Sequence, residues 1–538
     1  MNNETQREPR ICIIGAGMSG MLMGIKLLKA GISNFQIYER ASTVGGTWRE
    51  NRYPGVACDV ASFAYCYEFE PNANWSHRFS PGPEIFNYFK NTAEKYQLLP
   101  HIKFNTEVSK AEYKNNSWHI ESVSNTSSDI GKSQSVSSIV DQQSNKASNE
   151  QKTEHAEFDI FIAATGPLTK RKYPDIPGLE CFAGDRFHTA DWNDQYELAG
   201  KRVGVIGTGS SAVQMMDPLS NQAKELKVFQ RTAQWIMPTD NIKYTATQKK
   251  LKRWFPILGT LTRKFYDSIG ELFGAAALKD GWQRRYIDKS VLENLNSVSD
   301  PALREKLTPD HLAMCKRMIV SDSYYPAMQR NNVDVLIDNI IRVEPTGVVV
   351  NDGSEKGRLV EVDTLITATG FYPNAWGIDT VIGENGESLA AAWDRGVRTY
   401  RSVTMPGFPN YFMLIGPNSP ITNLSLIDIA DIGVNYAMQC INKFRKGELV
   451  SITPKEDVTA EFTDSLVNAF DGTRWVSGCN SWYLEVDGVP VTWPWAPSRY
   501  RKELKKINFD HYDVKVAWLD EEWLLNQKVF APLFLHSL

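Results

Sequence analysis

The sequence predicts an α/β protein with two domains that each bind a dinucleotide at the edge of a parallel sheet. Two glycine-rich segments support this fold, GAGMSG at 15–20 and GTGSSA at 207–212. Each follows a short apolar run and opens a helical pattern, which is the arrangement that lays a pyrophosphate on a helix N-terminus. Two such segments predict two dinucleotides held face to face, most simply a flavin and the nicotinamide that reduces it.

The first unit shows the full strand–helix–strand pattern. Residues 10–15 (RICIIG) predict a buried strand, 18–30 a helix that Gly31 ends, and 35–39 (FQIYE) the next strand. Glu39 lies about 20 residues past the glycines, where an acidic side chain holds a ribose hydroxyl. The first dinucleotide is therefore assigned to Gly15, Gly17, Gly20 and Glu39.

The second unit begins with the strand 201–207 (KRVGVIG). Its helix is expected to run from Ser210 and to be interrupted by Pro218. Its closing strand, 226–231, ends in Arg231 instead of an acid, and a guanidinium there suits a 2′-phosphate, so NADP is predicted over NAD. A solvated arginine at a strand end is the alternative. The second dinucleotide is assigned to Gly207, Thr208, Gly209, Ser210, Ser211, Arg231 and Thr232.

Other segments set the domain order. The similar strands 158–166 (FDIFIAATG) and 364–370 (TLITATG) are typical of places where a chain passes between two nucleotide-binding domains. Residues 122–157 are rich in Ser, Asn, Gln and Lys, which predicts a solvated loop or disordered insertion. The buried strand 411–417 (YFMLIGP) is expected to return to the first domain. The expected parts are a first dinucleotide domain at 1–165 and 373–538, a linker and second domain at 166–240 and 312–372, and a helical insertion at 241–311.

Composition and charge narrow the classes of function. The net charge of −4 argues against a nucleic-acid partner. Residues 1–10 lack an apolar signal core, and charges break the apolar stretch 255–278, so no transmembrane segment is expected. The seven cysteines are odd in number and contain no C-x-x-C pair, which argues against a disulfide framework. We expect a soluble cytoplasmic protein with reduced thiols and no metal site, either a monomer or a weak homo-oligomer.

Two further motifs carry a resemblance to a known family. Residues 182–192 (FAGDRFHTADW) fit F-x-G-x-x-x-H-x-x-x-W through Phe182, Gly184, His188 and Trp192. Residues 45–59 (GGTWRENRYPGVACD) contain Gly-Gly-x-Trp, then Tyr-Pro-Gly, then an aspartate. With the two glycine segments in this order, residues 11–420 resemble the type I Baeyer–Villiger monooxygenases. Asn193 departs from the family, which usually has Pro or Asp there.

The resemblance implies two Rossmann-like domains, one for FAD and one for NADP, and roles for several side chains. It implies that Arg317 stabilises a deprotonated C4a-peroxyflavin and the oxyanion of the ketone adduct. It implies that Asp59 positions Arg317, and that Lys316 reaches the NADP 2′-phosphate. His188 is expected to position the linker and handle the cofactor, without transferring protons. The alternatives are a surface basic pair at 316–317 and a turn residue at Asp59.

The resemblance also implies residues on the flavin and substrate sides. Gly46, Trp48 and Tyr65 are assigned to the flavin side, with core filling as the alternative for the two aromatic residues. Segment 418–425 (NSPITNLS) resembles the substrate-facing loop of the family. Asn423, Leu424 and Ser425 are therefore expected to shape the substrate pocket.

The implied activity is an NADPH- and O₂-dependent flavin monooxygenase that converts a ketone to an ester or lactone. Two alternatives remain: an N- or S-oxygenase acting on amines or sulfides, and a redox-sensing flavoprotein without turnover. Trp192, Asp59 and Arg317 speak against the N- or S-oxygenase. A pyridine-nucleotide disulfide reductase is disfavoured because no C-x-x-C pair is present to take electrons.

Overall fold

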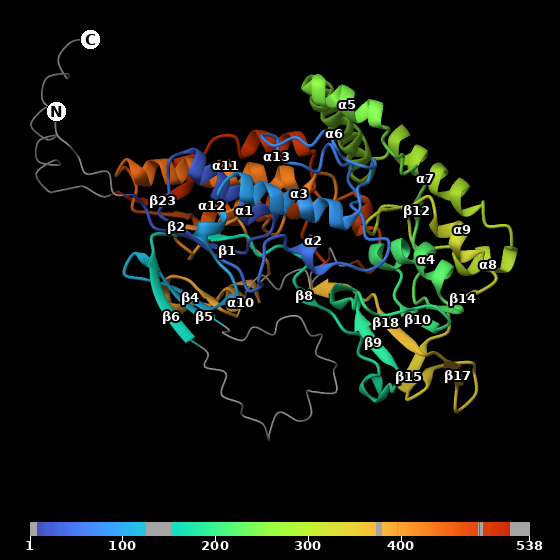
Figure 1. Ribbon diagram of the computed structural model, residues 1–538. Helices are drawn as coiled ribbons and strands as arrows, with labels where there is room; N and C mark the ends of the chain where they lie inside the picture. The colour runs from blue at the N-terminus through green and yellow to red at the C-terminus, as the bar shows by residue number, and fades with distance from the viewer. Residues whose placement is uncertain are drawn as a thin grey trace, which may run out of the picture.

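The computed structural model describes residues 8–124, 152–372, 379–394, 396–481, 484 and 488–516. Two five-stranded parallel sheets form the centres of two α/β units, which lie side by side (Figure 1). The α/β fold that the two glycine-rich segments predict is thereby confirmed.

The first sheet has β1 at its centre. Its strands run in the order β21-β7-β1-β2-β3, and every pair of neighbours is parallel. The strands are β1 (Ile11–Ile14), β2 (Phe35–Tyr38), β3 (Ile102–Lys103), β7 (Ile160–Ala163) and β21 (Tyr411–Met413). The strands expected at 10–15, 35–39 and 411–417 are all present, and the last does return the chain to the first sheet.

Both faces of this sheet are covered, because side chains of β1 alternate between two hydrophobic clusters. Ile11 and Ile13 belong to a cluster covered by helices, whereas Cys12 belongs to a cluster under an antiparallel sheet (Figure 1). The helices are α1 (Met18–Lys29), α3 (Gly82–Lys95) and α11 (Leu426–Arg445). The antiparallel sheet contains β4 (Thr106–Lys114), β5 (Ser117–Ser124), β6 (Lys152–Phe158) and β20 (Val381–Ile382).

The second sheet repeats this plan in the order β14-β11-β10-β18-β9, again with parallel neighbours. Its strands are β9 (Asp185–His188), β10 (Arg202–Ile206), β11 (Glu225–Phe229), β14 (Val333–Leu336) and β18 (Thr364–Thr367). One face packs on α4 (Ser210–Gln222) and α9 (Tyr324–Met328), and the other on the meander β15 (Ile340–Glu344), β16 (Gly347–Val350) and β17 (Arg358–Glu361).

The two Ala-Thr-Gly segments mark the crossings between the sheets, as expected. One follows β7 in the first sheet and the other follows β18 in the second. The connecting segments lie together, because β8 (Lys170–Arg171) pairs antiparallel with β19 (Phe371–Tyr372). The segment that leaves the first unit and the segment that returns to it are therefore adjacent.

The segment at 241–311 is helical, as predicted. It contains α5 (Ala246–Trp254), α6 (Pro256–Leu278), α7 (Trp282–Leu295) and α8 (Pro301–Lys306). Its two ends are joined where β12 (Ile236–Met237) pairs with β13 (Ile319–Val320). Figure 1 shows α5 and α6 projecting from the body of the molecule.

The remaining C-terminal elements pack on the first unit. They are α10 (Leu389–Trp393), β22 (Ser451–Pro454), α12 (Glu456–Asn468), α13 (Pro497–Glu503) and β23 (Tyr512–Lys515), and β22 pairs antiparallel with β23.

Three expectations from the sequence are wrong. The first concerns residues 122–157, whose two ends are strands and not loop. Residues 122–124 are the end of β5, and residues 152–157 lie in β6. The two strands pair from Trp118↔Phe158 to Ser124↔Lys152. The polar composition arises because β6 exposes most of its side chains to solvent. Residues 125–151 lie outside the described residues.

Pro218 does not interrupt its helix, since α4 continues through it to Gln222. A proline inside a helix removes the hydrogen bond to the carbonyl four residues earlier, here that of Gln214. Gly55 lies against that carbonyl: a Cβ at Gly55 would stand 2.3 Å from the Gln214 oxygen and 3.1 Å from Pro218 Cγ. The proline ring and the glycine thus form a close contact between the two units.

The third correction concerns the thiols. Cys315 and Cys479 form a disulfide across a sequence separation of 164, so the expectation of reduced thiols is wrong for this pair. No local spacing pattern announces a bond between positions this far apart. Cys12, Cys58, Cys66, Cys181 and Cys440 are free.

Candidate active site

The first glycine segment forms an open cradle at the N-terminus of α1. Its N-cap residue, Gly17, provides no side-chain cap to the first amides of the helix. Gly17 faces Gly46, and a Cβ on Gly46 would stand 3.1 Å from the Gly17 Cα. Gly20 packs on the turn, where a Cβ would meet the Gly15 oxygen at 1.8 Å. Amides at the start of α1 that no side chain caps, next to glycine backbone that leaves room for a ligand, fit a pyrophosphate.

Glu39 lies buried at the end of β2, directly beside this cradle. Its carboxylate accepts hydrogen bonds from the Ala16 amide at 2.9 Å and the Ala41 amide at 3.0 Å. Arg49 donates to the same carboxylate at 3.1 Å. Arg49 was not predicted as a site residue, although it follows Trp48 directly within the 45–59 motif. These three hydrogen bonds thus fix the Glu39 carboxylate at the place where the sequence predicts a ribose contact.

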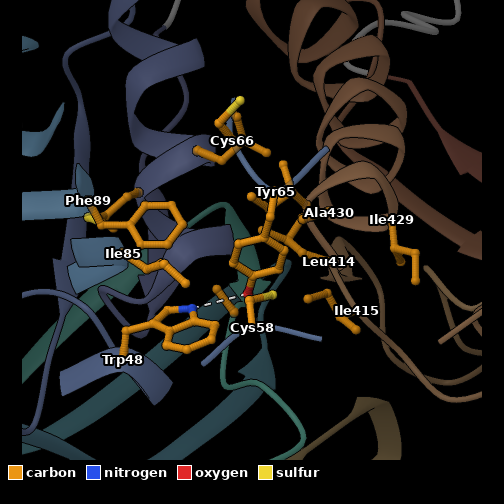
Figure 2. Packing of buried hydrophobic residues seen from close by; sticks show 14 of the residues in the cluster. Trp48, Cys58, Tyr65, Cys66, Ile85, Phe89, Leu414, Ile415, Ile429 and Ala430 are labelled. Carbon is orange, nitrogen blue, oxygen red and sulfur yellow. Dashed lines mark hydrogen bonds between the residues drawn. The ribbon is translucent and has the colours of Figure 1, made fainter. Parts of the chain in front are cut away.

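Trp48 and Tyr65 contact each other behind the cradle. The indole Nε1 donates to the Tyr65 hydroxyl at 3.1 Å, and the rings meet edge to face (Figure 2). Burial raises the pKa of Tyr65 far above its usual value, so it stays a neutral phenol. Both rings belong to the main hydrophobic cluster, together with Phe89 and Leu414 (Figure 2). Core packing is therefore established for both, and a flavin contact stays a prediction.

The second cradle repeats the first at the N-terminus of α4. A Cβ at Gly207 would stand 2.4 Å from the Ala368 oxygen, just as one at Gly15 would stand 2.6 Å from the Ala164 oxygen. Gly209 is the N-cap, without a side-chain cap and with open space around it, and Ser210 and Ser211 begin the helix. The Thr208 hydroxyl donates to the Thr232 carbonyl at 2.6 Å, which ties the glycine turn to the segment after β11.

Arg231 and Lys316 approach one another at this second cradle. Arg231 is exposed after β11, and Lys316 is half-buried. The pKa of Lys316 is lowered, first by desolvation, while Asp310 opposes this shift and the charge of Arg231 adds to it. Two cations within electrostatic reach of one another favour an anionic ligand. This fits the 2′-phosphate predicted from the sequence.

Arg317, the neighbour of Lys316 in the chain, contacts the first unit. Its Nη2 and Nε donate to Asp59 Oδ2 at 2.5 and 3.1 Å, and its Nη1 donates to the Ile421 carbonyl at 3.3 Å. Both charged side chains are partly exposed, at 34% for Arg317 and 28% for Asp59. The guanidinium is therefore fixed by two segments distant in sequence while it stays partly exposed to solvent. The pairing of Asp59 with Arg317 was predicted, but the contact with Ile421 was not.

The loop 418–425 lies next to this guanidinium through Ile421. Asn423 is buried, and neither its Nδ2 nor its Oδ1 has a partner among the described residues. Ser425 is also buried and donates to the Ala64 carbonyl at 3.3 Å, while Leu424 packs against the main cluster. A buried amide without partners is costly unless a ligand satisfies it. Asn423 is thus the member of this loop whose surroundings fit a substrate contact best.

The linker motif is held by close packing and by backbone contacts. Phe182 and Trp192 are buried, and a Cβ at Gly184 would stand 2.4 Å from the Asp363 oxygen. His188 Nδ1 accepts from the Ala190 amide, and its Nε2 lies 3.1 Å from the Gly370 carbonyl. Desolvation lowers the pKa of His188 to about 4, so the ring is neutral. This placement agrees with a positioning role and leaves no ring nitrogen for proton transfer.

A polar contact between the two units was not predicted. Tyr53 donates to Gln214 Oε1 at 2.8 Å, and Gln214 Nε2 donates to the Ala57 carbonyl at 2.9 Å. Together with Gly55 against α4, these bonds hold the 45–59 motif to the second unit. The Tyr-Pro-Gly of the motif signals such a close approach, although it does not say to which partner.

Comparison with known proteins identifies the family. The profile described as "Flavin-binding monooxygenase-like" matches residues 8–380. An uncharacterized monooxygenase of Mycobacterium bovis is 38% identical over 512 residues, covering 95% of this chain and 97% of the relative. A Baeyer-Villiger monooxygenase of Streptomyces coelicolor is 33% identical over 520 residues, covering 95% and 94%.

Solved structures agree with these relatives. Cyclohexanone monooxygenase from Rhodococcus sp. Phi1 bound to NADP⁺ aligns with a TM-score of 0.80 and 25% identity, covering 95% of this chain and 99% of that one. An oxidized steroid monooxygenase bound to NADP gives 0.79 and 26%, covering 95% and 100%. Since the family profile spans most of the chain and the relatives align over nearly its whole length, the chain belongs to the flavin-binding monooxygenase-like family.

Proposed function

We propose that this enzyme is a Baeyer–Villiger monooxygenase that uses FAD, NADPH and O₂ to convert a ketone to an ester or lactone. The observation that carries the proposal is the fixed guanidinium of Arg317. It is held by Asp59 of the first unit and by the 418–425 loop, while Lys316 beside it lies within electrostatic reach of Arg231. The named relatives and the FAD- and NADP-bound neighbours support the same reaction class.

Each cofactor has a set of residues that fits it. FAD would lie at the first cradle, on Gly15, Gly17, Gly20 and Gly46, with Glu39 at its ribose. NADPH would lie at the second, on residues 207–211 and 232, with Arg231 and Lys316 at the 2′-phosphate. The bound flavin supplies the reduction of O₂ by electrons from NADPH and the oxygen that is transferred.

The residues of the chain make the site suitable for a ketone. The Arg317 guanidinium stays protonated at any working pH, so it stabilises an anionic oxygen without surrendering a proton to it. Asp59 fixes its orientation, which lowers the reorganisation needed when charge develops on the carbonyl oxygen. Asn423 provides a buried donor and acceptor for the substrate.

One experiment tests the proposal. Purified holoenzyme is offered linear, cyclic and bulky aromatic ketones, a sulfide and an amine, and NADPH consumption and oxygenated product are measured together. Ester or lactone formed in proportion to NADPH supports the proposal. Oxidation of the sulfide or amine alone would establish the N- or S-oxygenase, and FAD binding without NADPH oxidation would establish the redox-sensing flavoprotein.

Three finer points belong to the same proposal. The domain boundaries are those given by the sequence, with FAD on 1–165 and 373–538, NADP on 166–240 and 312–372, and the insertion at 241–311. The enzyme works in the cytoplasm, where NADPH is supplied, and as a monomer or weak homo-oligomer. Sedimentation of the purified holoenzyme checks the oligomeric state.

A further inference from the structure

Helix α5 and the first half of α6 lie in a segment with a concentration of positive charge. Residues 241–266 contain seven Lys and Arg residues and no Asp or Glu, in a protein whose net charge is −4. Long-range attraction to an anionic surface depends on such local clusters and not on the net charge of the molecule.

The same two helices expose large apolar side chains in a helical stripe. Trp254 at the end of α5 is 64% exposed, and Ile257 and Phe265 on α6 are 61% and 62% exposed. Leu261 is also exposed and lies four residues from both Ile257 and Phe265, and the exposed Leu272 follows Phe265 by seven residues, about two helical turns. Soluble monomers rarely expose a contiguous apolar patch of this kind unless it binds something.

We refer to α5 and α6 together as the α5–α6 hairpin. Other residues of this hairpin contact the first unit, so the stripe of apolar side chains stays exposed to solvent. Arg263 donates to Asp428 at 2.5 Å and to the Cys66 carbonyl at 2.9 Å. The Lys252 ammonium lies 3.5 Å from the centre of the Phe63 ring. By contrast, no carboxylate among the described residues pairs with Lys243, Lys249, Lys250, Arg253 or Lys264. These five residues therefore carry positive charges that no described carboxylate neutralises.

We propose that the α5–α6 hairpin docks this enzyme on an anionic lipid surface. Unpaired basic residues beside Trp, Phe, Ile and Leu are the composition of an interfacial helix, whose apolar face enters the headgroup region while its basic groups bind anionic lipids. A second copy of the chain fits this face poorly, because a two-fold contact would bring the same unpaired cations together. No described helix is long and apolar enough to cross a membrane.

The far end of α6 reaches the candidate substrate loop. A Cβ at Gly274 would stand 2.6 Å from the Asn423 Cβ, so this part of the helix packs directly on Asn423. Helix α6 thus carries part of the exposed stripe and, near its other end, contacts the substrate loop. Docking would place the site beside the phase in which apolar ketones concentrate. The docking inference itself rests on the hairpin alone and not on the proposed reaction.

The test is co-sedimentation of the FAD-loaded enzyme with vesicles. One set contains phosphatidylcholine alone, and the other equal parts of phosphatidylcholine and phosphatidylglycerol. We expect the protein to pellet with the anionic vesicles, to remain in solution with the neutral ones, and to be released by high salt. Protein that stays in solution with both sets at low salt would overturn the proposal.

Two variants and two matched controls locate the surface. Lys249→Gln/Lys250→Gln/Lys264→Gln should weaken partitioning by about 100-fold, since each basic residue near an anionic surface contributes about 1 kcal/mol and about 1.4 kcal/mol is tenfold. Trp254→Ser/Ile257→Ser/Phe265→Ser should abolish binding. The control Lys224→Gln/Lys356→Gln/Lys446→Gln removes exposed lysines elsewhere, and Ile337→Ser/Leu359→Ser removes exposed apolar residues elsewhere.

Flavin content confirms that each variant is folded. Equal loss of binding in hairpin variants and controls would contradict the assignment. Sedimentation velocity without vesicles tests whether a second copy of the chain binds this surface instead. A dimer that dissociates when the hairpin residues are substituted would overturn the proposal.

Discussion

Arg317 Nη2 lies 2.5 Å from Asp59 Oδ2, although 258 positions separate the two residues in the chain. Asp59 follows the Tyr-Pro-Gly turn of the first unit, whereas Arg317 lies after the helical insertion, just before β13. A charged pair that is partly open to solvent contributes little to stability. Its value lies in the fixed direction of the guanidinium, and this leads to the first prediction.

Arg317→Ala should keep its fold and its FAD but form no ester. Loss of one preorganised donor to an oxyanion costs about 10²–10³ in rate, and loss of a charged donor should cost at least that much. NADPH oxidation should continue with release of H₂O₂. Asp59→Ala should give a milder loss, because it removes the support of Arg317 and not the charge itself. Gas chromatography of ester and a coupled peroxide assay measure both in one reaction; ester at the unmodified rate would disprove the assignment.

Gly15→Ala should yield mostly apoprotein. Gly15 has φ +99°, and a Cβ there would stand 2.6 Å from the Ala164 oxygen, so β1 and β7 would have to separate beside the cradle. Gly259→Ala is the matched control, because it lies in α6 with open space around it. The ratio of flavin to protein absorbance measures the outcome. Full flavin in both variants would remove the first cradle as the FAD site.

Arg231→Ala should lower the preference for NADPH over NADH. We expect the unmodified enzyme to favour NADPH by at least about tenfold, which corresponds to about 1.4 kcal/mol. The variant should show a raised KM for NADPH and an almost unchanged KM for NADH, because Lys316 then faces the 2′-phosphate alone. Steady-state kinetics with both coenzymes decide this. Equal losses with NADPH and NADH would mean that Arg231 has a structural role only.

Cys315→Ser should lower the midpoint temperature of unfolding. The bond between Cys315 and Cys479 closes a long segment of chain, and removal of such a bond typically costs about 2–4 kcal/mol. A reducing agent should bring the unmodified protein to the level of the variant and leave the variant unchanged. Cys181→Ser, at a free and exposed thiol, is the control. A thermal scan that shows no effect of the reducing agent on the unmodified protein would contradict the bond.

His188 should make the protein less stable in acid. Desolvation lowers its pKa to about 4, from about 6.5 in the unfolded chain. The unfolded state therefore binds a proton first as the pH falls. The stability is fully present above pH ~6.5 and declines toward pH ~4, by about 3 kcal/mol in total. The midpoint difference between the unmodified protein and His188→Asn should shrink over this range. His155→Asn, at an exposed histidine, should show no such trend.

Local patterns account for the parts that the sequence predicts well. The strand, glycine turn and helix at 11–29 are adjacent in the chain, so apolar spacing and Gly17 define them almost to the residue. The Asp59–Arg317 pair came from the family resemblance, because no spacing rule joins positions so far apart. The Cys315–Cys479 bond and the contact of Gly55 with Gln214 had neither a local pattern nor a resemblance to reveal them.

The two remaining errors arose from local patterns that have more than one structural meaning. The polar residues of β6 indicated a loop because an edge strand with a solvated face contains the same residue types as a loop. Pro218 indicated a break because a proline in a helix usually leaves the carbonyl four residues earlier without its hydrogen bond and clashes with it. In this protein Gly55 leaves room for that carbonyl and for the proline ring.

The strand order of the first sheet has a consequence for biosynthesis. β21, which pairs with β7, belongs to residues 411–413, whereas all five strands of the second sheet lie between 185 and 367. On the ribosome, the unit that starts second therefore emerges complete while the unit that starts first still lacks an edge. Domains fold as units during synthesis. The nascent chain must keep the β7 edge unpaired through about 250 residues of translation, the interval in which it is most exposed to mispairing.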